Sequence, residues 1–449
     1  MMKRMIKGTY RQFSVLWPRR VALTLVLSSG FVVSANGATS NATDTDGLFA
    51  NMQQLSPTQL VEAVLKRNAD IPAMQATWQA AQARIEQAGA FDDPKLSYQV
   101  APQTLGQNTM DAGQKLSISQ RLPWPGKRGL RADVARFEAD ASREGIARAR
   151  LRLTEATERS YADWYFVHAA LRINRINQSL LREFQNIAEI KYAAGRTSKQ
   201  DVLRAEVEAT LLEHRNIVLQ RQRREVLSRI NTLLQRLPDA PLPQPGNLVG
   251  LNPLPSIVVL RQQALKNHPE LRALQARIMA SRRRLTLSER DFYPDVTFSA
   301  GYNSLWNQDE KRLTAGASIN IPLRGKRNAA SDETRARTLR LDADQKTNVA
   351  KILDAVQRAY EQVRESEHVL TLYGDRLLPL AEENLAAAQS DYESGSGGFL
   401  ELISAEKNRM QTQLQLEQAK ADYHRRLATL KHTIGGPLML QERNTGSNP

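Results

Sequence analysis

One stretch constrains the fold more than any other: residues 130–194 run for 65 residues without proline and with a single glycine, Gly145. A helix of that length would extend about 100 Å at roughly 1.5 Å per residue, several times the length of an ordinary globular helix. Its second half carries apolar residues in alternating steps of three and four, the pattern of a coiled-coil seam. These residues are Ile173, Ile176, Leu180, Phe184, Ile187, Ile190 and Ala194. The sequence therefore predicts a long coiled-coil rod, and a cytoplasmic coiled-coil scaffold is one interpretation of it.

The N-terminus predicts export. Residues 1–20 contain six basic side chains and no acid, and the apolar run 21–33 that follows is too short to span a membrane as a helix. Small residues around Ala35 and Ala38 complete the pattern of a cleaved secretory signal peptide, predicted at residues 1–38. The chain has no cysteine, so we expect no disulfide, no thiolate metal site and no lipid anchor on an N-terminal cysteine.

The charge and the polar residues exclude several classes of protein. The formal net charge of +15 suits nucleic acid or anionic lipid, and export argues against nucleic acid as a partner. No phosphate-binding loop occurs, and the six histidines are scattered without a metal-binding spacing. Adjacent acids such as Glu382 and Glu383 diverge by about 100° on a helix, which does not suit acid–base catalysis. The sequence therefore predicts no enzyme, no cofactor and no metal site.

Turn-forming residues divide the chain into helical and hairpin segments that occur twice. The first repeat is predicted at 56–237, with a β-hairpin at 95–122 and a tip turn at 193–198. The second repeat is predicted at 257–436, with a β-hairpin at 295–322 and a tip turn at 393–399. A Pro-rich linker at 238–256 separates the repeats, and a flexible tail follows at 437–449. Each repeat reads as helix, hairpin, long helix, tip turn and helix.

Matching residues show that the two segments arose by tandem duplication. The matches are Leu65 with Leu265, Ala73 with Ala273, Pro94 with Pro294, Pro123 with Pro322, Gly126 with Gly325, Tyr192 with Tyr392, and Gly195 with Gly395. The offset is 200 in the first and last blocks and 199 in the middle block. An offset kept over some 140 residues predicts one supersecondary unit used twice.

The second hairpin alternates apolar with small or polar residues. Its apolar positions are Val296, Phe298, Ala300 and Tyr302 in one strand and Leu313, Ala315, Ala317, Ile319 and Ile321 in the other. This alternation is typical of strands with lipid on one side and water on the other, and the edge of a soluble β-sandwich is the alternative. Four strands per chain cannot close a barrel, so a barrel would have to be shared between subunits.

Both tip turns carry one signature, in which a tyrosine precedes the tip glycine by three residues and an acid follows it by six. The signature residues are Tyr192, Gly195, Asp201, Ala205 and Glu206 in the first repeat and Tyr392, Gly395, Glu401, Ala405 and Glu406 in the second. With the duplication and the proline-bracketed hairpins, these signatures resemble the TolC-type outer membrane efflux family over residues 56–436. The motif at 122–128 is most similar to its heavy-metal branch, the CzcC and CusC relatives.

The resemblance implies a mainly α fold with a small β part, assembled as a homotrimer. Three chains would share a 12-stranded β-barrel in the Gram-negative outer membrane, continued by a tunnel of long coiled-coil helices in the periplasm. The implied function is the exit duct of a tripartite efflux system, working with a periplasmic adaptor protein and an inner membrane resistance-nodulation-division pump on heavy-metal cations. The alternatives are a duct for drugs or other small molecules and a periplasmic coiled-coil scaffold without a pore.

Three sets of residues are candidates for function. Prolines at the helix–strand junctions stop each element because proline fixes φ and lacks a donor; they are Pro94, Pro123, Pro294 and Pro322. The resemblance implies that an adaptor meets the tip turns, where the expected contact residues are Gly195, Arg196, Gly395 and Ser396. The third set is a predicted pore constriction.

Asp201 and Glu401 are the predicted constriction. Each lies in the first turn of the returning helix, so the duplication places both at equivalent height. Threefold assembly would put six carboxylates around one opening, and such rings attract cations. The resemblance supports Glu401 directly. The alternative is that each acid only stabilises a helix N-terminus.

Overall fold

The computed structural model describes residues 48–49, 52–102, 113–248, 250, 253–304 and 312–438. The predicted signal peptide, the tips of both predicted hairpins and the tail beyond residue 438 lie outside these ranges. All described residues belong to one unit, Asp46–Pro449. Among the helices in these ranges, none combines the length and the apolar character that a membrane-spanning helix needs.

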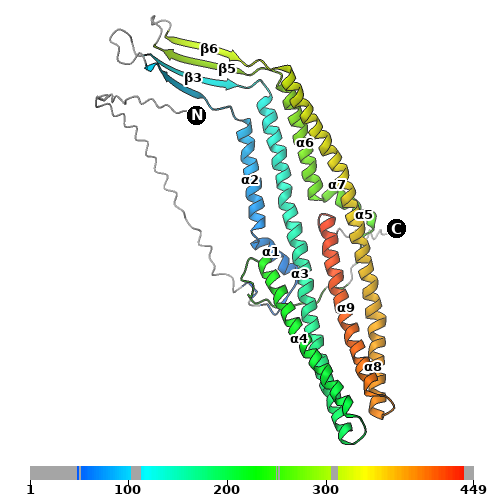
Figure 1. Cartoon of the computed structure of the whole chain (residues 1–449). Helices are drawn as coiled ribbons and strands as arrows, with labels where there is room; N and C mark the ends of the chain where they lie inside the picture. Colours follow the sequence, from blue (N-terminus) through cyan, green and yellow to red (C-terminus); the bar gives the residue numbers. More distant parts are fainter. Residues whose placement is uncertain are drawn as a thin grey trace, which may run out of the picture. The chain divides into compact units, whose positions relative to one another are not determined.

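The first half of the chain is built on α3, a helix that runs unbroken for 67 residues (Figure 1). Its elements are β1 (Gln54–Leu55), α1 (Pro57–Arg67), α2 (Asp70–Gly89), β2 (Lys95–Val100), β3 (Gln114–Leu122), α3 (Lys127–Ala193) and α4 (Lys199–Leu233). Helix α1 starts at a capping box between Ser56 and Gln59. Gly126, with a φ of 90°, makes the sharp turn from the strand segment into α3.

The second half repeats the same order of helices and strands (Figure 1). Its elements are β4 (Gln244–Pro245), α5 (Ile257–Asn267), α6 (Pro269–Arg290), β5 (Val296–Asn303), β6 (Leu313–Ile319), α7 (Arg324–Leu372), a π-helical turn (Tyr373–Leu377), α8 (Leu378–Ser394) and α9 (Phe399–Thr433). The predicted fold class, mainly α with a small β part, is confirmed.

The two halves differ by one residue inside their long helices, and the π-helical turn accommodates it. The offset between the halves is 199 at Pro123 and Pro322 but 200 at Tyr192 and Tyr392. Between these points the second half has a π-helical turn of five residues, whereas α3 is unbroken. A π-turn contains one more residue than the α-turn it replaces. It therefore accommodates an inserted residue while the residues before and after it stay on the same sides of the helix.

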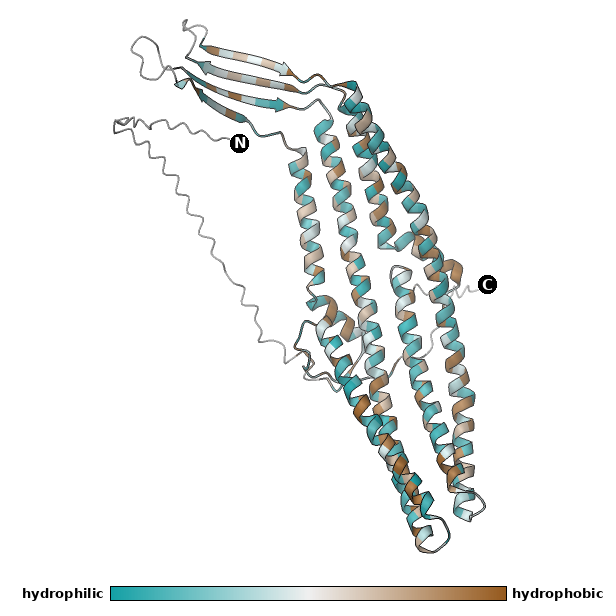
Figure 2. Cartoon of the chain, viewed as in Figure 1, coloured by the Kyte–Doolittle hydropathy of each residue, from teal (hydrophilic) through white to brown (hydrophobic). Residues whose placement is uncertain are grey.

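The main sheet has the order β2-β3-β5-β6 with every neighbouring pair antiparallel. Its central pair joins the two halves, with Leu116 opposite Tyr302 and Ser117 opposite Gly301. Except for Gln114 and Gln120 of β3, which pair with Val100 and Phe298, the register places apolar and polar residues on opposite faces. Hydropathy therefore alternates along the strands (Figure 2). The large exposed side chains of the apolar face are Leu96, Tyr98, Val100, Leu116, Ile118, Phe298, Tyr302, Leu313 and Ile319. Within the described part of this sheet, β2 and β6 are the edge strands, with one neighbour each.

Strand β6 is shorter than the predicted strand, which extended to Ile321. It ends at Ile319 because the next residue, Asn320, forms a local bond: the Asp295 N–H donates to the side-chain oxygen of Asn320 at 2.5 Å. This bond ties the end of β6 to the start of β5.

The described residues contain six strands rather than the predicted four. Strands β1 and β4 pair in parallel and bring the predicted linker against the segment before α1. Tyr161 of α3 holds this pair, since its hydroxyl donates to the backbone oxygens of Leu55 at 2.6 Å and Gly246 at 3.2 Å. Strands of two residues carry no periodicity, so nothing in the sequence pattern indicated them.

The buried stripe of α3 near the tips differs from the predicted coiled-coil seam. Its members are Ile173, Asn177, Leu181, Phe184 and Ala188. The predicted seam residues Ile176 and Ile190 are instead 48% and 62% exposed. Helix α3 packs on α4 and also on α9, so its buried stripe lies between these two neighbours. Leu180 and Ile187 pack at the border of this core, whereas Ile176 and Ile190 lie on the exposed side of the helix.

The π-helical turn predicts which one-residue deletion the fold tolerates. Deleting Gly374 should convert the turn to α-helix, keep the tip residues in place and leave the melting temperature nearly unchanged. Deleting Arg175, an exposed residue of the unbroken helix α3, should rotate everything after it by about 100° and remove Leu181 and Phe184 from the core. We expect that control to cost more than about 3 kcal/mol, measured by circular dichroism during heating; equal losses in both variants would contradict this explanation.

Candidate functional site

Both tip turns reverse the chain at a glycine in the left-handed conformation. The φ angles are 69° at Gly195 and 85° at Gly395. The next N–H groups, of Arg196 and Ser396, donate back to carbonyls of the last helical turn at 2.8 and 2.9 Å, which satisfies acceptors that a helix end leaves open. Arg196 and Ser396 are exposed. The four predicted tip residues thus occupy equivalent outer positions on two matching turns.

The two tip turns of one chain are tied to each other. The Lys191 ammonium group donates to the backbone oxygen of Tyr392 and lies 4.1 Å from the centre of the Tyr392 ring. The Tyr392 ring packs in turn on Phe399, with ring centres 5.3 Å apart. Because Tyr392 and Phe399 are only 4% and 2% exposed, this cluster forms a small core at the very end of the helices.

Asp201 lies in the first turn of α4, with its carboxylate held by a hydrogen bond from the Thr197 hydroxyl. It is half-buried and faces the neighbouring turn. Burial raises the pKa of the Tyr392 hydroxyl, and the negative charge of Asp201 raises it further. Asp201 is thus engaged with its own helix start and with the second tip turn.

Glu401 occupies the equivalent position in α9 and is exposed. Its carboxylate folds back over the residue that precedes the helix, so a Cβ at Gly398 would lie 2.3 Å from Oε2 of Glu401. No ion pair or hydrogen bond between described residues joins Asp201 to Glu401 within the chain. Both acids sit where a helix N-terminus stabilises negative charge, and the constriction stays a prediction about the assembly.

A buried ion pair above the tips was missed by the sequence analysis. Glu406, 5% exposed, pairs with Arg409 at 3.0 Å, and the same guanidinium donates to the Asn177 side chain at 2.8 Å. Burial raises the pKa of Glu406, and the Arg409 charge and hydrogen bond oppose that rise. The only sequence signal was that Glu406 ends the tip signature. Its counterpart Glu206 is exposed, so the repeat of the signature does not repeat the role.

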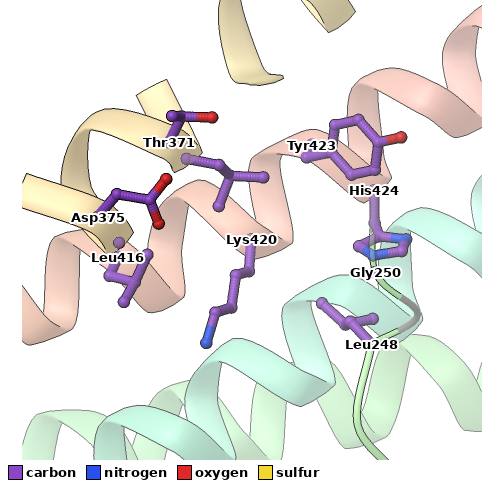
Figure 3. Close-up of a pocket in the computed structure, with 10 residues that line it drawn as sticks. Leu248, Gly250, Thr371, Asp375, Leu416, Lys420, Tyr423 and His424 are labelled. Carbon is purple, nitrogen blue, oxygen red and sulfur yellow. The ribbon is translucent and has the colours of Figure 1, made fainter. Parts of the chain in front are cut away.

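A cavity of about 410 Å³ lies beside the π-helical turn. Its lining comes from three segments: Thr371 and Asp375 at the turn, Leu416 and Lys420 on α9, and Leu248 after β4 (Figure 3). Lys420 is paired with Glu417 at 2.8 Å. None of these residues belongs to a sequence motif, so no pattern pointed to the cavity. Within the described ranges, no three His, Cys, Asp or Glu side chains gather as a metal site.

The four predicted junction prolines all lie between a helix and a strand. Pro94 directly precedes β2 and Pro123 directly follows β3, while Pro294 lies just before β5 and Pro322 lies between β6 and α7. At the central junction, the Trp124 ring stacks on Tyr293 with ring centres 5.2 Å apart. This contact places the end of β3 against the start of β5.

Beneath that stack, a buried lysine joins the two halves of the chain. Lys127 is 1% exposed, and its ammonium group donates to the Tyr293 backbone oxygen and to the Asp295 carboxylate, each at 2.8 Å. Asp291 supplies a further carboxylate oxygen at 3.4 Å. The ammonium therefore has three acceptors for its three N–H groups, which is what a buried lysine requires.

Asp295 is the acceptor at the centre of this junction. Besides Lys127, its carboxylate accepts from the Trp124 N–H at 3.0 Å and from the Arg121 guanidinium. Burial by itself would raise the pKa of Asp295, but the hydrogen bonds from Lys127, Trp124 and Arg121 lower it to about 2. The carboxylate is therefore charged whenever the fold is intact above that pH.

Comparison with known proteins places both halves in one family. A family model described as outer membrane efflux protein matches residues 60–235 and again residues 260–436. This double match confirms the predicted tandem duplication. Among curated proteins, nodulation protein T of Rhizobium leguminosarum bv. trifolii is 24% identical over 384 residues, which cover 79% of this chain and 80% of that one.

Solved structures agree with this fold. The outer-membrane channel OprN is similar with a TM-score of 0.72 and 20% identity, over 85% of this chain and 90% of OprN. CusC, whose structures were described in connection with folding and transmembrane channel formation, is similar with a TM-score of 0.72 and 18% identity, over 85% of this chain and 92% of CusC.

The buried junction predicts a specific loss of stability. Asp295→Asn leaves the Lys127 charge buried with weakened partners, and we expect a cost of roughly 3–5 kcal/mol in the free energy of unfolding. Asp93→Asn, an exposed acid at the other helix-to-strand junction, is the matched control and should cost less than about 0.5 kcal/mol. Urea unfolding at neutral pH measures both.

The pH dependence gives an independent check. Because the folded-state pKa of Asp295 is depressed from 3.8 to about 2, its contribution is present above about pH 4 and is lost as the pH falls toward 2. The stability of the parent protein should therefore decline more steeply over this range than that of Asp295→Asn. Parallel declines would show that Asp295 does not carry the junction.

Proposed function

The chain belongs to the outer membrane efflux protein family, and we propose that three copies of it form the exit duct of a tripartite efflux system. As a member of this family the protein is a transporter component of the outer membrane and not an enzyme. The observation that carries the proposal is the four-stranded sheet, which has an apolar outer face, a polar inner face and two bare edges. A sheet with these properties needs further copies of itself to close.

The internal duplication supports an assembly in which subunits contact each other as the two halves of one chain do. Within the chain, β3 pairs with β5, α3 packs on α6, and α3 packs on α9. Applying the same relation once more pairs β6 with β2 of the next copy, α7 with its α2, and α8 with its α4. These elements are the ones left bare in the single chain.

Helix α4 carries an apolar stripe that such a neighbour would cover. The stripe consists of Leu203, Val207, Leu211 and Ile217, which are 49–68% exposed and recur at helical spacing. On the opposite side of the chain, Leu380 of α8 is 58% exposed. An apolar stripe on α4 and an exposed leucine on α8, at opposite sides of one chain, favour a closed ring of copies over a single pair.

We place the apolar strand face in lipid and the tip turns at the periplasmic end. The paired turns with Gly195, Arg196, Gly395 and Ser396 would present one repeated surface to a periplasmic adaptor, and a resistance-nodulation-division pump would supply the energy. The six carboxylates of Asp201 and Glu401 in a trimer would line the mouth. Their supports are the equivalent positions in α4 and α9 and the exposure of Glu401.

Heavy-metal cations are the cargo that we propose to test first, with drugs or other small molecules as the alternative. The motif at 122–128 is the basis for this choice. Its residues Trp124 and Lys127 close the strand-to-helix junction, a role that any cargo would require. Growth of a deletion strain on metal salts and on organic toxicants, with and without the gene, separates the two.

Cysteine cross-linking tests the shared barrel, and the chain has no cysteine of its own. Ile319→Cys is combined with Tyr98→Cys or with Val100→Cys. These two pairs test the expected pairing of β6 with β2 of the next copy at two successive outward-facing positions of β2. At least one of these pairs should give covalent dimers and trimers on a non-reducing gel after mild oxidation. Ile319→Cys with Ile118→Cys, which lies on the inner strand β3, is the control. Absence of oligomers from both test pairs would favour a scaffold without a pore.

Conductance tests the mouth. In planar bilayers, Asp201→Asn combined with Glu401→Gln should relieve block by a trivalent cation added on the tip side. It should also lower the preference of the channel for cations, because the double variant removes six negative charges from the mouth of a trimer. Glu393→Gln, an exposed acid of the same turn, is the control. If block persists and stability alone falls by about 0.3–1 kcal/mol per site, the two acids are helix caps.

A further inference from the structure

We propose that the inner face of the strand section is a cationic girdle, which favours solutes carrying carboxylate, phosphate or sulfate groups. The girdle consists of Lys95 and Lys115 of each chain. This inference rests on the proposed function, because it takes the polar face of the sheet as the wall of a water-filled barrel. It assigns to the duct a second charged section besides the predicted acidic mouth.

The strand register places both lysines on the polar face. Lys95 of β2 lies opposite Ser119, and Lys115 of β3 lies between Gln99 and Asn303. These neighbours belong to the face that is lined by serine, threonine, glycine and amide side chains, opposite the apolar face. Both lysines are exposed, and neither has an ion-pair partner among the described residues.

The strands provide no negative charge to balance these lysines. Strands β2, β3, β5 and β6 contain no aspartate and no glutamate. The third basic residue of this face, Arg121, is already paired with Asp295 and lies 4.0 Å from Asp92. Lys95 and Lys115 are therefore the uncompensated charges of the face within the described strands.

Threefold assembly would arrange the six lysines as two rings. Lys115 is four residues along β3 from Ser119, the partner of Lys95, so the rings would be roughly 13 Å apart along the wall. Charges of one sign on a channel wall raise the local concentration of counter-ions. At 0.1 M salt their field extends about 10 Å from the wall, so the preference is strongest for large solutes that pass close to it. A divalent metal would pass this section more readily as an anionic complex than as a bare cation.

Reversal potentials of purified trimers in planar bilayers under a potassium chloride gradient test the girdle. Lys95→Gln with Lys115→Gln should reduce the ratio of chloride to potassium permeability by about twofold or more at 0.1 M salt, where screening leaves the wall charge effective. Lys95→Arg with Lys115→Arg keeps the charge and should keep the ratio. Charged groups outside the described strands are the same in all variants, so the comparison isolates the two lysines.

The outcomes separate this inference from the function on which it rests. An unchanged permeability ratio in the glutamine variant, with normal conductance, overturns the girdle and leaves the duct intact. A loss of preference in the arginine variant as well would also overturn it, because the charge is then not responsible. If the parent protein and all variants are folded, with a normal melting temperature, and none of them conducts, the proposed duct function is itself contradicted.

Discussion

The fold depends on a buried charge pair between its two halves. Lys127 opens the long helix of the first half, and Asp295 directly precedes the first strand of the second half. Their contact at 2.8 Å fixes the point where β3 turns into α3 against the point where α6 turns into β5. The pairing of β3 with β5 and the packing of α3 on α6 both start there. Because a buried ammonium group is costly unless every N–H has an acceptor, the junction has one satisfied geometry. The direction of the sheet relative to the helices follows from it.

The same junction is not repeated at the bare edges of the chain. Under the duplication, Lys326 corresponds to Lys127, but Lys95 stands where Asp295 would be. Lys326 is exposed, in contrast to Lys127. A contact between copies would therefore lack the buried carboxylate that joins the halves of one chain. The acids closest to Lys95 in sequence are Asp92 and Asp93, and both are exposed. The contact between the two halves of one chain is thus stabilised by a buried ion pair. Contacts between copies would instead depend on strand pairing and on apolar helix faces, which are covered only when copies assemble.

Sequence patterns predicted those parts of the structure that obey a period. The alternation in 296–302 predicted the two faces of the sheet. The change of offset from 199 to 200 is visible in the sequence, but it did not predict the π-helical turn that accommodates the extra residue. Contacts between distant residues had no such signal. Arg409 pairs with Glu406 on its own helix and also donates to Asn177 of α3, which is 232 positions away in sequence. The predicted seam was wrong at Ile176 and Ile190 because α3 packs on both α4 and α9. A period shows which residues share a face, but not which neighbour will cover that face.

The two proposed charged sections of the duct differ in how much of their charge is free. Asp201 and Glu401 each lie in the first turn of a helix, whose N-terminus carries about half a positive charge. Asp201 is further engaged by the Thr197 hydroxyl. Lys95 and Lys115 lie on strands, which have almost no net dipole, and their strand neighbours are uncharged. Per residue, the lysines therefore expose more of their charge to a passing solute than the acids do. The acids offset this only through proximity, because Coulomb energy rises as distance falls and a narrow mouth brings the wall close to the solute. In a resting duct with a narrow mouth, the acids of the mouth would thus determine the preference for cations or anions. When the tips move apart, the lysines of the strand section would determine it instead.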